Sequence, residues 1–113
     1  MRDIIVTIPA TIKWDEYKKE LDRAAKGEIL NFKVNHFPKT EKGCKCYILH
    51  RGYIRGYMFI SGLSTKKFTC TTTGKVWAGK FIERTGKYYP LIRPISMTGF
   101  QGFRYFGKES SNE

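Results

Sequence analysis

Residues 44–61 read CKCYILHRGYIRGYMFIS, and this stretch decides the fold. Apolar side chains alternate with polar or small ones on both sides of a short connection, His50-Arg51-Gly52. Alternation at period two predicts half-buried strands, and a short connection that contains glycine predicts a β-hairpin between them. We therefore expect strands at Cys44–Leu49 and Tyr53–Ser61, joined by a tight turn.

The period-two pattern continues on both sides of this hairpin. Glycines inside three of the predicted segments, Gly56, Gly79, Gly99 and Gly102, are expected to mark bulges or sharp bends. The segment after Lys87 contains Pro90 and Pro94, which predicts an edge or irregular strand. The further predicted strands are Asp3–Ile8 (a short strand or extended arm), Ile29–Phe37, Lys67–Thr71, Lys75–Arg84, Tyr88–Ile95 and Met97–Phe106.

One helix is predicted near the N-terminus, over Trp14–Lys26. Its apolar residues recur at helical spacing and form one stripe. Thr11 is the expected N-cap and Gly27 the expected C-cap. The predicted fold class is therefore α+β, a small barrel-like, mostly antiparallel sheet of five to seven short strands with one N-terminal helix, because closure removes exposed sheet edges. Residues 1–107 are expected to form a single compact basic domain, and residues 108–113 a flexible tail.

The composition indicates a folded protein of a reducing compartment. The chain has 113 residues, of which 41% are hydrophobic, and no apolar run approaches the length of a membrane span. The first residues do not read as a signal peptide. Three cysteines, an odd number, suit a reducing environment better than a disulfide framework. We expect a cytoplasmic location and no membrane partner.

Positive charge is concentrated in the predicted sheet. The whole chain carries a formal net charge of +11. Residues 1–28 have six basic and six acidic side chains, whereas residues 29–108 have 15 basic side chains and only two acidic ones, a net of +13. Such a field attracts polyanions and raises the rate at which they associate. We therefore expect a nucleic-acid partner, with an acidic protein as the alternative.

Residues 10–62 resemble the PUA-like superfamily, which includes the PUA, ASCH and EVE domains. A helix that contains Trp14 precedes a strand, and a charged loop leads into EKGCKCYI at residues 41–48. GYIRGY at residues 52–57 is similar to the return strand of that superfamily. Cys44 stands where the family usually has an acidic residue after the glycine. The resemblance implies a pseudo-barrel that binds RNA or modified bases.

The predicted interface combines basic and aromatic side chains, since aromatic faces stack on unpaired bases while Arg and Lys neutralise phosphates. By strand alternation, Tyr53, Arg55 and Tyr57 are expected to share one face. The alternative is that the tyrosines are half-buried barrel residues and that Trp77 is a packing residue. The predicted binding residues are Tyr47, Arg51, Tyr53, Arg55, Tyr57, Lys75, Trp77, Lys80, Arg84 and Arg104.

No metal site, cofactor site or catalytic set is predicted. Cys44, Cys46, His50 and Cys70 do not have the spacing of a zinc knuckle. Two histidines, His36 and His50, could cleave RNA together with a lysine, but no spacing of nucleophile and base is legible. We expect a binding protein for RNA or for single-stranded or modified DNA. The alternatives are an inhibitor or accessory protein with an acidic partner, and a weak nuclease or base-modifying hydrolase.

Overall fold

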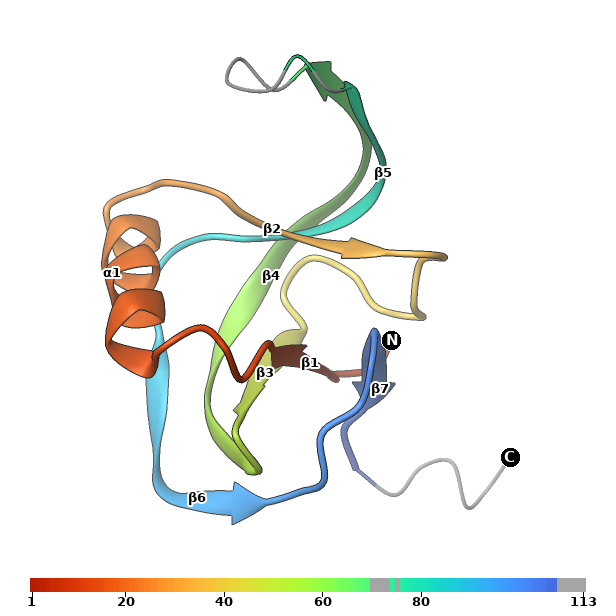
Figure 1. The fold of residues 1–113 in the computed structure, drawn as a ribbon. Coiled ribbons are helices and arrows are strands. Elements are labelled where there is room, and N and C mark those ends of the chain that lie inside the picture. The colour runs from red at the N-terminus through yellow and green to blue at the C-terminus, as the bar shows by residue number, and fades with distance from the viewer. Residues whose placement is uncertain (70–73, 75, 108–113) are drawn as a thin grey trace.

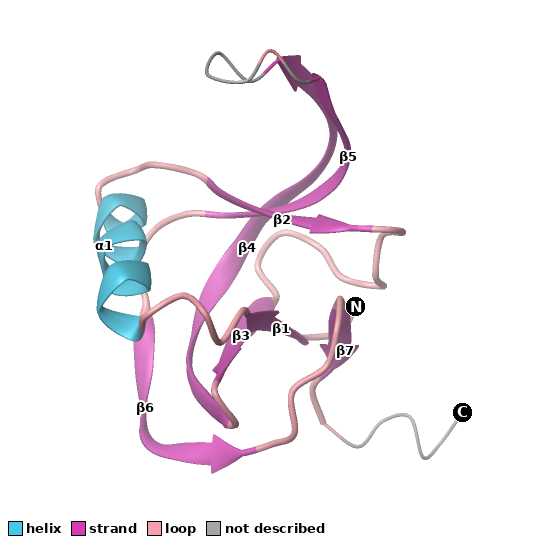
Figure 2. Cartoon of the chain, in the orientation of Figure 1, coloured by secondary structure: helices cyan, strands magenta, loops and turns pink. Residues whose placement is uncertain are grey.

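The computed structural model describes residues 1–69, 74 and 76–107 (Figures 1 and 2). The side chains of residues 68, 69 and 77 lie outside this description. The elements are β1 (Ile4–Ile8), α1 (Trp14–Ala25), β2 (Leu30–Val34), β3 (Lys45–His50), β4 (Tyr53–Thr69), β5 (Val76–Arg84), β6 (Tyr89–Ser96) and β7 (Phe103–Tyr105).

The strands of the described chain form one strongly curled sheet. Its order is β2-β5-β4-β3-β1-β7, and β6 pairs with β4 beside this path. β1 runs parallel to β3, and the other described pairs are antiparallel. The sheet curls into a half-barrel with α1 along one side (Figure 1). The predicted barrel-like, mostly antiparallel sheet with one helix is therefore confirmed at this level.

The long strand β4 connects the two parts of the curled sheet. Its first half pairs with β3, and its second half, from Ile60 onward, pairs with β5. The register shifts between Ile60 and Gly62, so that Ser61 forms a bulge where the strand passes from one partner to the other. The sequence predicted two separate strands, Tyr53–Ser61 and Lys67–Thr71, which is wrong because residues 62–66 between them also pair with β5. Beyond β2, β4 and β5 continue as a two-stranded arm (Figure 1).

Helix α1 begins and ends close to its predicted limits. Its N-cap is Lys13, with extended backbone and no side-chain cap bond, so the predicted Thr11 cap is wrong. Asp15 and Glu16 in the first turn favour the positive end of the helix dipole. At the other end Gly27 has a φ of 108°, and the amide of Glu28 donates to the carbonyl of Arg23. The C-cap itself is Lys26, so the predicted Gly27 lies one residue beyond it, in the left-handed conformation that suits glycine.

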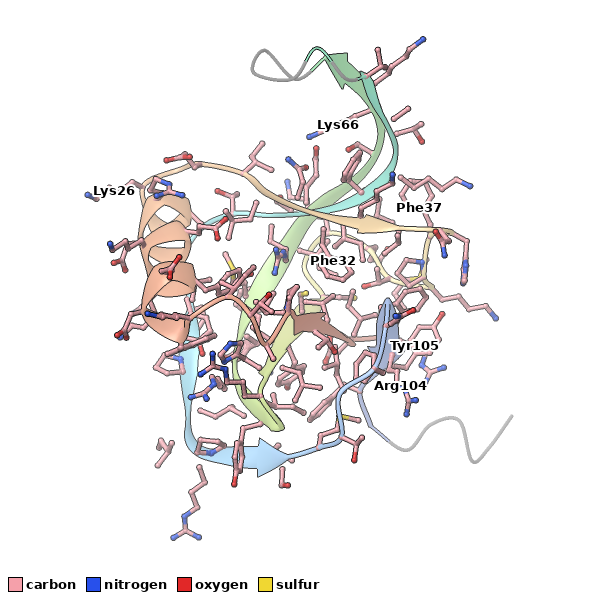
Figure 3. All side chains as sticks on the ribbon, viewed as in Figure 1. Lys26, Phe32, Phe37, Lys66, Arg104 and Tyr105 are labelled. Carbon is pink, nitrogen blue, oxygen red and sulfur yellow. The ribbon has the colours of Figure 1, made fainter. Side chains whose placement is uncertain are left out.

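Three clusters of buried side chains hold the fold together. An interior cluster inside the curl contains Ile4, Val6 and Ile82, and Phe32 points toward it from β2 (Figure 3). A helix cluster joins α1 to the inner face of β3 and β4, and its residues are Ile8, Tyr17, Leu21, Ala24, Ile48 and Met58. An outer cluster lies on the opposite face of the same strands, and its residues are Ile5, Tyr47, Leu49 and Ile54.

The last third of the chain covers the outer cluster. Leu91 packs against it from β6, Met97 and Phe100 from the segment that leads to β7, and Phe106 from just after β7. Only Phe103–Tyr105 of the predicted strand Met97–Phe106 is extended and paired, on the free edge of β1. The rest of that segment is irregular because it crosses the outer cluster instead of following a neighbouring strand. Both faces of β3 and β4 are therefore packed against other parts of the chain. Because β6 pairs with β4 beside Tyr57, it borders the part of the outer face where aromatic side chains remain exposed.

Candidate nucleic-acid interface

Three partly exposed aromatic rings meet on the face of the sheet opposite α1. Tyr57 on β4 and Tyr89 on β6 are register partners, and their rings stack with centroids 5.2 Å apart and planes 16° apart. Phe59 meets both rings edge-on, at centroid distances of 5.6 Å and 5.7 Å. Phe59 remains 40% exposed although it lies on a central strand. We call Tyr57, Phe59 and Tyr89 the aromatic surface.

Two lysines stand over the aromatic surface. The Lys45 ammonium lies 4.8 Å from the centroid of the Tyr57 ring, and the Lys87 ammonium lies 5.4 Å from that of Tyr89. Lys45 is the register partner of Phe59, and its backbone amide donates to Asp3 Oδ1 at 2.8 Å, which fixes the start of β3. Both ammonium groups lie within the range of cation–π attraction. The surface therefore presents π faces and positive charge side by side.

A buried ring supports the aromatic surface from below. Tyr47, a predicted binding residue, is 8% exposed and stacks on Phe106 at 3.9 Å. Its ring lies 5.5 Å from that of Tyr57. Burial raises the pKa of Tyr47. The structure places Tyr47 beneath the surface, where it can position Tyr57 but cannot stack on a base.

The predicted shared face of Tyr53, Arg55 and Tyr57 is wrong. Leu49 pairs with Ile54 but Ile48 pairs with Gly56, so Arg55 is an extra residue in the strand. This bulge reverses the alternation that the sequence pattern implied. Tyr53 pairs with His50 and lies on the α1 side, whereas Tyr57 pairs with Tyr47 on the other side.

Arg51 and Arg55, both predicted to bind phosphates, contact other parts of the protein. Arg51 donates from Nε and Nη2 to the carbonyl of Ala10, at 3.0 Å and 2.8 Å. The guanidinium of Arg55 lies 5.0 Å from the centroid of the Trp14 ring, on the helix side of the sheet. The predicted binding residues of the hairpin therefore do not form one surface. Tyr57 lies on one face, Tyr53 and Arg55 lie on the other, and Arg51 is bonded to the backbone of Ala10.

The other predicted basic residues are dispersed. Lys80 is exposed on β5, 6.0 Å from the ring of Phe37. Arg84 is 2% exposed and is therefore no surface ligand for a phosphate. Arg104 projects from β7, at the opposite side of the molecule from α1, and lies 4.9 Å from the Phe100 ring (Figure 3). Lys75 and the side chain of Trp77 lie outside the described residues.

Phe59, Tyr89, Lys45 and Lys87 are the residues that the sequence reasoning missed. Tyr57 and Phe59 alternate on one strand, and that signal was available in the sequence. The contribution of β6 could not be predicted from the sequence, because no local pattern indicates that Tyr89 pairs with Tyr57. Lys87 lies two residues before the start of this strand, so the same pairing positions it.

The charges of the two sides of the molecule differ. Helix α1 is nearly neutral, whereas the strands are basic: its acidic side chains are Asp15, Glu16, Glu20 and Asp22, and its basic ones are Lys18, Lys19 and Arg23. On the sheet, Glu83 pairs with Lys66 at 2.5 Å and accepts a hydrogen bond from Ser64. The bonds from Lys66 and Ser64 lower the pKa of Glu83. Glu83 therefore adds little negative field to the strands.

Comparison of the sequence and the fold with known proteins identifies no relative. No family model matches the chain, no curated protein is similar to it, and no solved structure matches its fold. The resemblance to the PUA-like superfamily is neither supported nor contradicted by these comparisons and stays a prediction. Among the described helices, none has the length and apolar character needed to cross a bilayer.

Proposed function

We propose that this protein binds single-stranded nucleic acid through the aromatic surface of β4 and β6. The observation that carries the proposal is the contact of Tyr57, Phe59 and Tyr89 with one another beneath the ammonium groups of Lys45 and Lys87. Aromatic rings on a sheet provide stacking sites for unpaired bases, and neighbouring cations contact the phosphates between them.

Phe59 is the primary stacking residue in this proposal. It is 40% exposed, and its contacts with Tyr57 and Tyr89 are T-shaped, so it makes no parallel stack with either ring. Tyr57 and Tyr89 hold each other in place by their stacked contact. A base that stacks on Phe59 would bring its phosphates toward Lys45, the register partner of Phe59.

The charge of the sheet supports a polyanionic ligand. Residues 29–108 carry a net charge of +13, and Glu83, one of their two acids, is paired with Lys66. The four acidic side chains of α1 are nearly balanced by its three basic ones, Lys18, Lys19 and Arg23, so the helix opposes this field little. A single strand would therefore approach the aromatic surface under long-range attraction.

The finer description of the fold and the location belong to the same proposal. The half-barrel with one helix along its side is compatible with a PUA-like pseudo-barrel over residues 10–62. Cys44 and Cys46 are free thiols, which is compatible with the cytoplasm. A PUA-like assignment favours RNA over DNA as the single strand.

The proposal is tested by salt-titrated binding to labelled oligonucleotides. Fluorescence anisotropy is measured with single strands of about 12 nucleotides, as RNA and as DNA, and with the corresponding duplex. The parent should prefer single strands, and its affinity should fall linearly on a log–log plot against salt. The double change Lys45→Gln and Lys87→Gln should lower the slope by about 1.4, because each single-strand phosphate contact contributes about 0.7.

A matched control removes the same charge elsewhere. Lys19 and Lys26 lie exposed on α1 and at its end, and Lys26 points away from the molecule (Figure 3). Lys19→Gln with Lys26→Gln should leave the slope close to that of the parent. Equal slopes for both double variants would show that the aromatic surface is not the binding site. If the parent shows no salt-sensitive binding to any oligonucleotide, the alternative of an acidic protein partner replaces this proposal.

A further inference from the structure

A cavity of about 430 Å³ opens at the seam of the half-barrel. β1 and β2 stand on either side of this seam because the sheet path does not join them to each other. α1 covers the seam, and the cavity lies between these three elements. The residues of its lining that matter here are Tyr17, Glu20, Glu28, Leu30, Phe32 and Arg84. A volume of this size is typical of sites for small organic molecules.

Arg84, the last residue of β5, is a buried cation at this cavity. It is 2% exposed, and its side chain lies beneath α1, where Nη1 donates to the Tyr17 hydroxyl at 3.1 Å. It also contacts the thiol of Cys46. Its Nε is buried and has no hydrogen-bond partner. A guanidinium has five N–H donors, so much of its bonding capacity is unused.

No group of the described chain neutralises this charge. Burial raises the pKa of Tyr17 and of Cys46, so both partners are neutral at pH 7. Among residues 1–69, 74 and 76–107, no carboxylate forms an ion pair with Arg84. A buried charge without a counter-ion is strongly destabilising, and proteins rarely retain one without compensation.

We propose that the cavity binds the carboxylate of a small organic acid and that Arg84 is its anchor. The guanidinium fork matches a planar carboxylate, with which it forms two parallel hydrogen bonds. Leu30 and Phe32 provide apolar lining for the rest of the molecule. This site is separate from the aromatic surface, and the inference does not rest on nucleic-acid binding.

The acidic residues of the lining favour a carboxylate over a phosphate. Glu20 and Glu28 line the same cavity, and Glu28 is paired with Arg23 at 3.5 Å. A single negative charge balances the single charge of Arg84. The second charge of a phosphate monoester would face the Glu20 carboxylate, and the other cation of the lining, Arg23, is already paired with Glu28.

The direct test follows the Nε–H signal of Arg84 by NMR in the intact protein. The signal is assigned by its loss in Arg84→Lys, and the probes are benzoate, its neutral amide benzamide, acetate and inorganic phosphate, each up to about 20 mM. Benzoate should shift the signal and raise the melting temperature, whereas benzamide should do neither. If neither benzoate nor acetate moves the signal, or if benzamide or phosphate moves it as much as benzoate, the proposal is overturned.

Two substitutions add independent evidence. Arg84→Met should lower benzoate affinity about 10- to 100-fold, since a hydrogen-bonded ion pair is lost. Glu20→Gln on the partly exposed face of α1 should tighten benzoate about 2- to 5-fold, because a like charge is removed. Glu16→Gln removes an exposed acid of the same helix outside the cavity lining and should change nothing.

These variants remain informative if Arg84→Met does not fold, because Glu20→Gln alters only a partly exposed side chain. Unchanged benzoate affinity in Glu20→Gln would overturn the proposal. A large loss of stability in Glu20→Gln would also overturn it, since Glu20 would then be the counter-ion of Arg84 in solution. Benzoate binding that persists in a folded Arg84→Met variant would exclude Arg84 as the anchor.

Discussion

The rings of Tyr57 and Tyr89 stack with centroids 5.2 Å apart and planes 16° apart, although one lies on β4 and the other on β6. The stack depends on the register between these strands, in which Gly56 pairs with Pro90 and Tyr57 with Tyr89. The aromatic surface is therefore a property of strand pairing and not of one strand. Substitutions that alter the register between β4 and β6 should weaken nucleic-acid binding. Substitutions on the α1 side of β4 should leave it unchanged.

Replacing Phe59 by alanine should weaken single-strand binding without unfolding the protein. The lost stacking is worth about 1–3 kcal/mol, or roughly 5- to 150-fold in affinity, and the effect on duplex should be much smaller. Tyr53→Ala is the matched control, since Tyr53 is also exposed, at 48%, on the same strand but on the opposite face. Anisotropy titrations measure both. A greater loss with Tyr53→Ala would move the interface to the α1 side.

Much of the fold was predictable from local pattern. The hairpin at Arg51 and Gly52, the helix with its Gly27 end and the strand before Thr85 follow from periodicity and turn residues, which act over a few neighbours. The single continuous strand β4 was not predictable, since Gly62, Ser64 and Thr65 resemble a loop until β5 pairs with them.

The site was less predictable because one residue changes its geometry. The bulge at Arg55 places Tyr53 and Tyr57 on opposite faces, and no feature other than Gly56 indicates it in the sequence. Arg84 follows the same alternation as the exposed Lys80 but is buried, because α1 packs over that end of β5. Long-range packing therefore decides which basic residues are available to a ligand.

Gly56→Ala should destabilise the protein and disturb the aromatic surface. A methyl group at Gly56 would overlap the Tyr88 phenol and would lie 2.5 Å from the Tyr89 carbonyl oxygen. The phenol can move, but the carbonyl belongs to the pairing of β4 with β6, so β6 must shift. We expect a loss of about 1–3 kcal/mol in urea denaturation.

Gly79→Ala is the control for a glycine within a strand. There a methyl group would lie 2.8 Å from Cε of Lys33, at the far end of a flexible side chain that can move aside. This variant should retain nearly all of the stability of the parent. Similar losses in both variants would indicate that backbone freedom, and not the close approach of β6, explains the glycine at position 56.

Arg51 should contribute to stability and not to binding. Its φ of 49° and the φ of 84° at Gly52 give the mirror-image turn that suits a two-residue hairpin. Its guanidinium ties this turn to the carbonyl of Ala10, in the segment before α1. Arg51→Gln should cost about 1 kcal/mol in chemical denaturation. The slope of binding against salt should stay unchanged in Arg51→Gln, and a lower slope would restore Arg51 as a phosphate ligand.

Tyr88 should make the protein sensitive to alkaline pH. Burial raises the pKa of Tyr88 from 10.0 to about 12, against an opposing effect of the nearby Arg55 charge. A group that holds its proton more tightly when folded stabilises the folded state fully below its unfolded pKa, and this contribution is lost as pH rises through the folded pKa. The free energy of unfolding should therefore fall between about pH 10 and pH 12. Tyr88→Phe should show a shallower fall over this window in urea titrations, and Tyr53→Phe controls for the loss of one exposed hydroxyl. Identical pH profiles for Tyr88→Phe and the parent would show that Tyr88 titrates alike in the folded and unfolded chains.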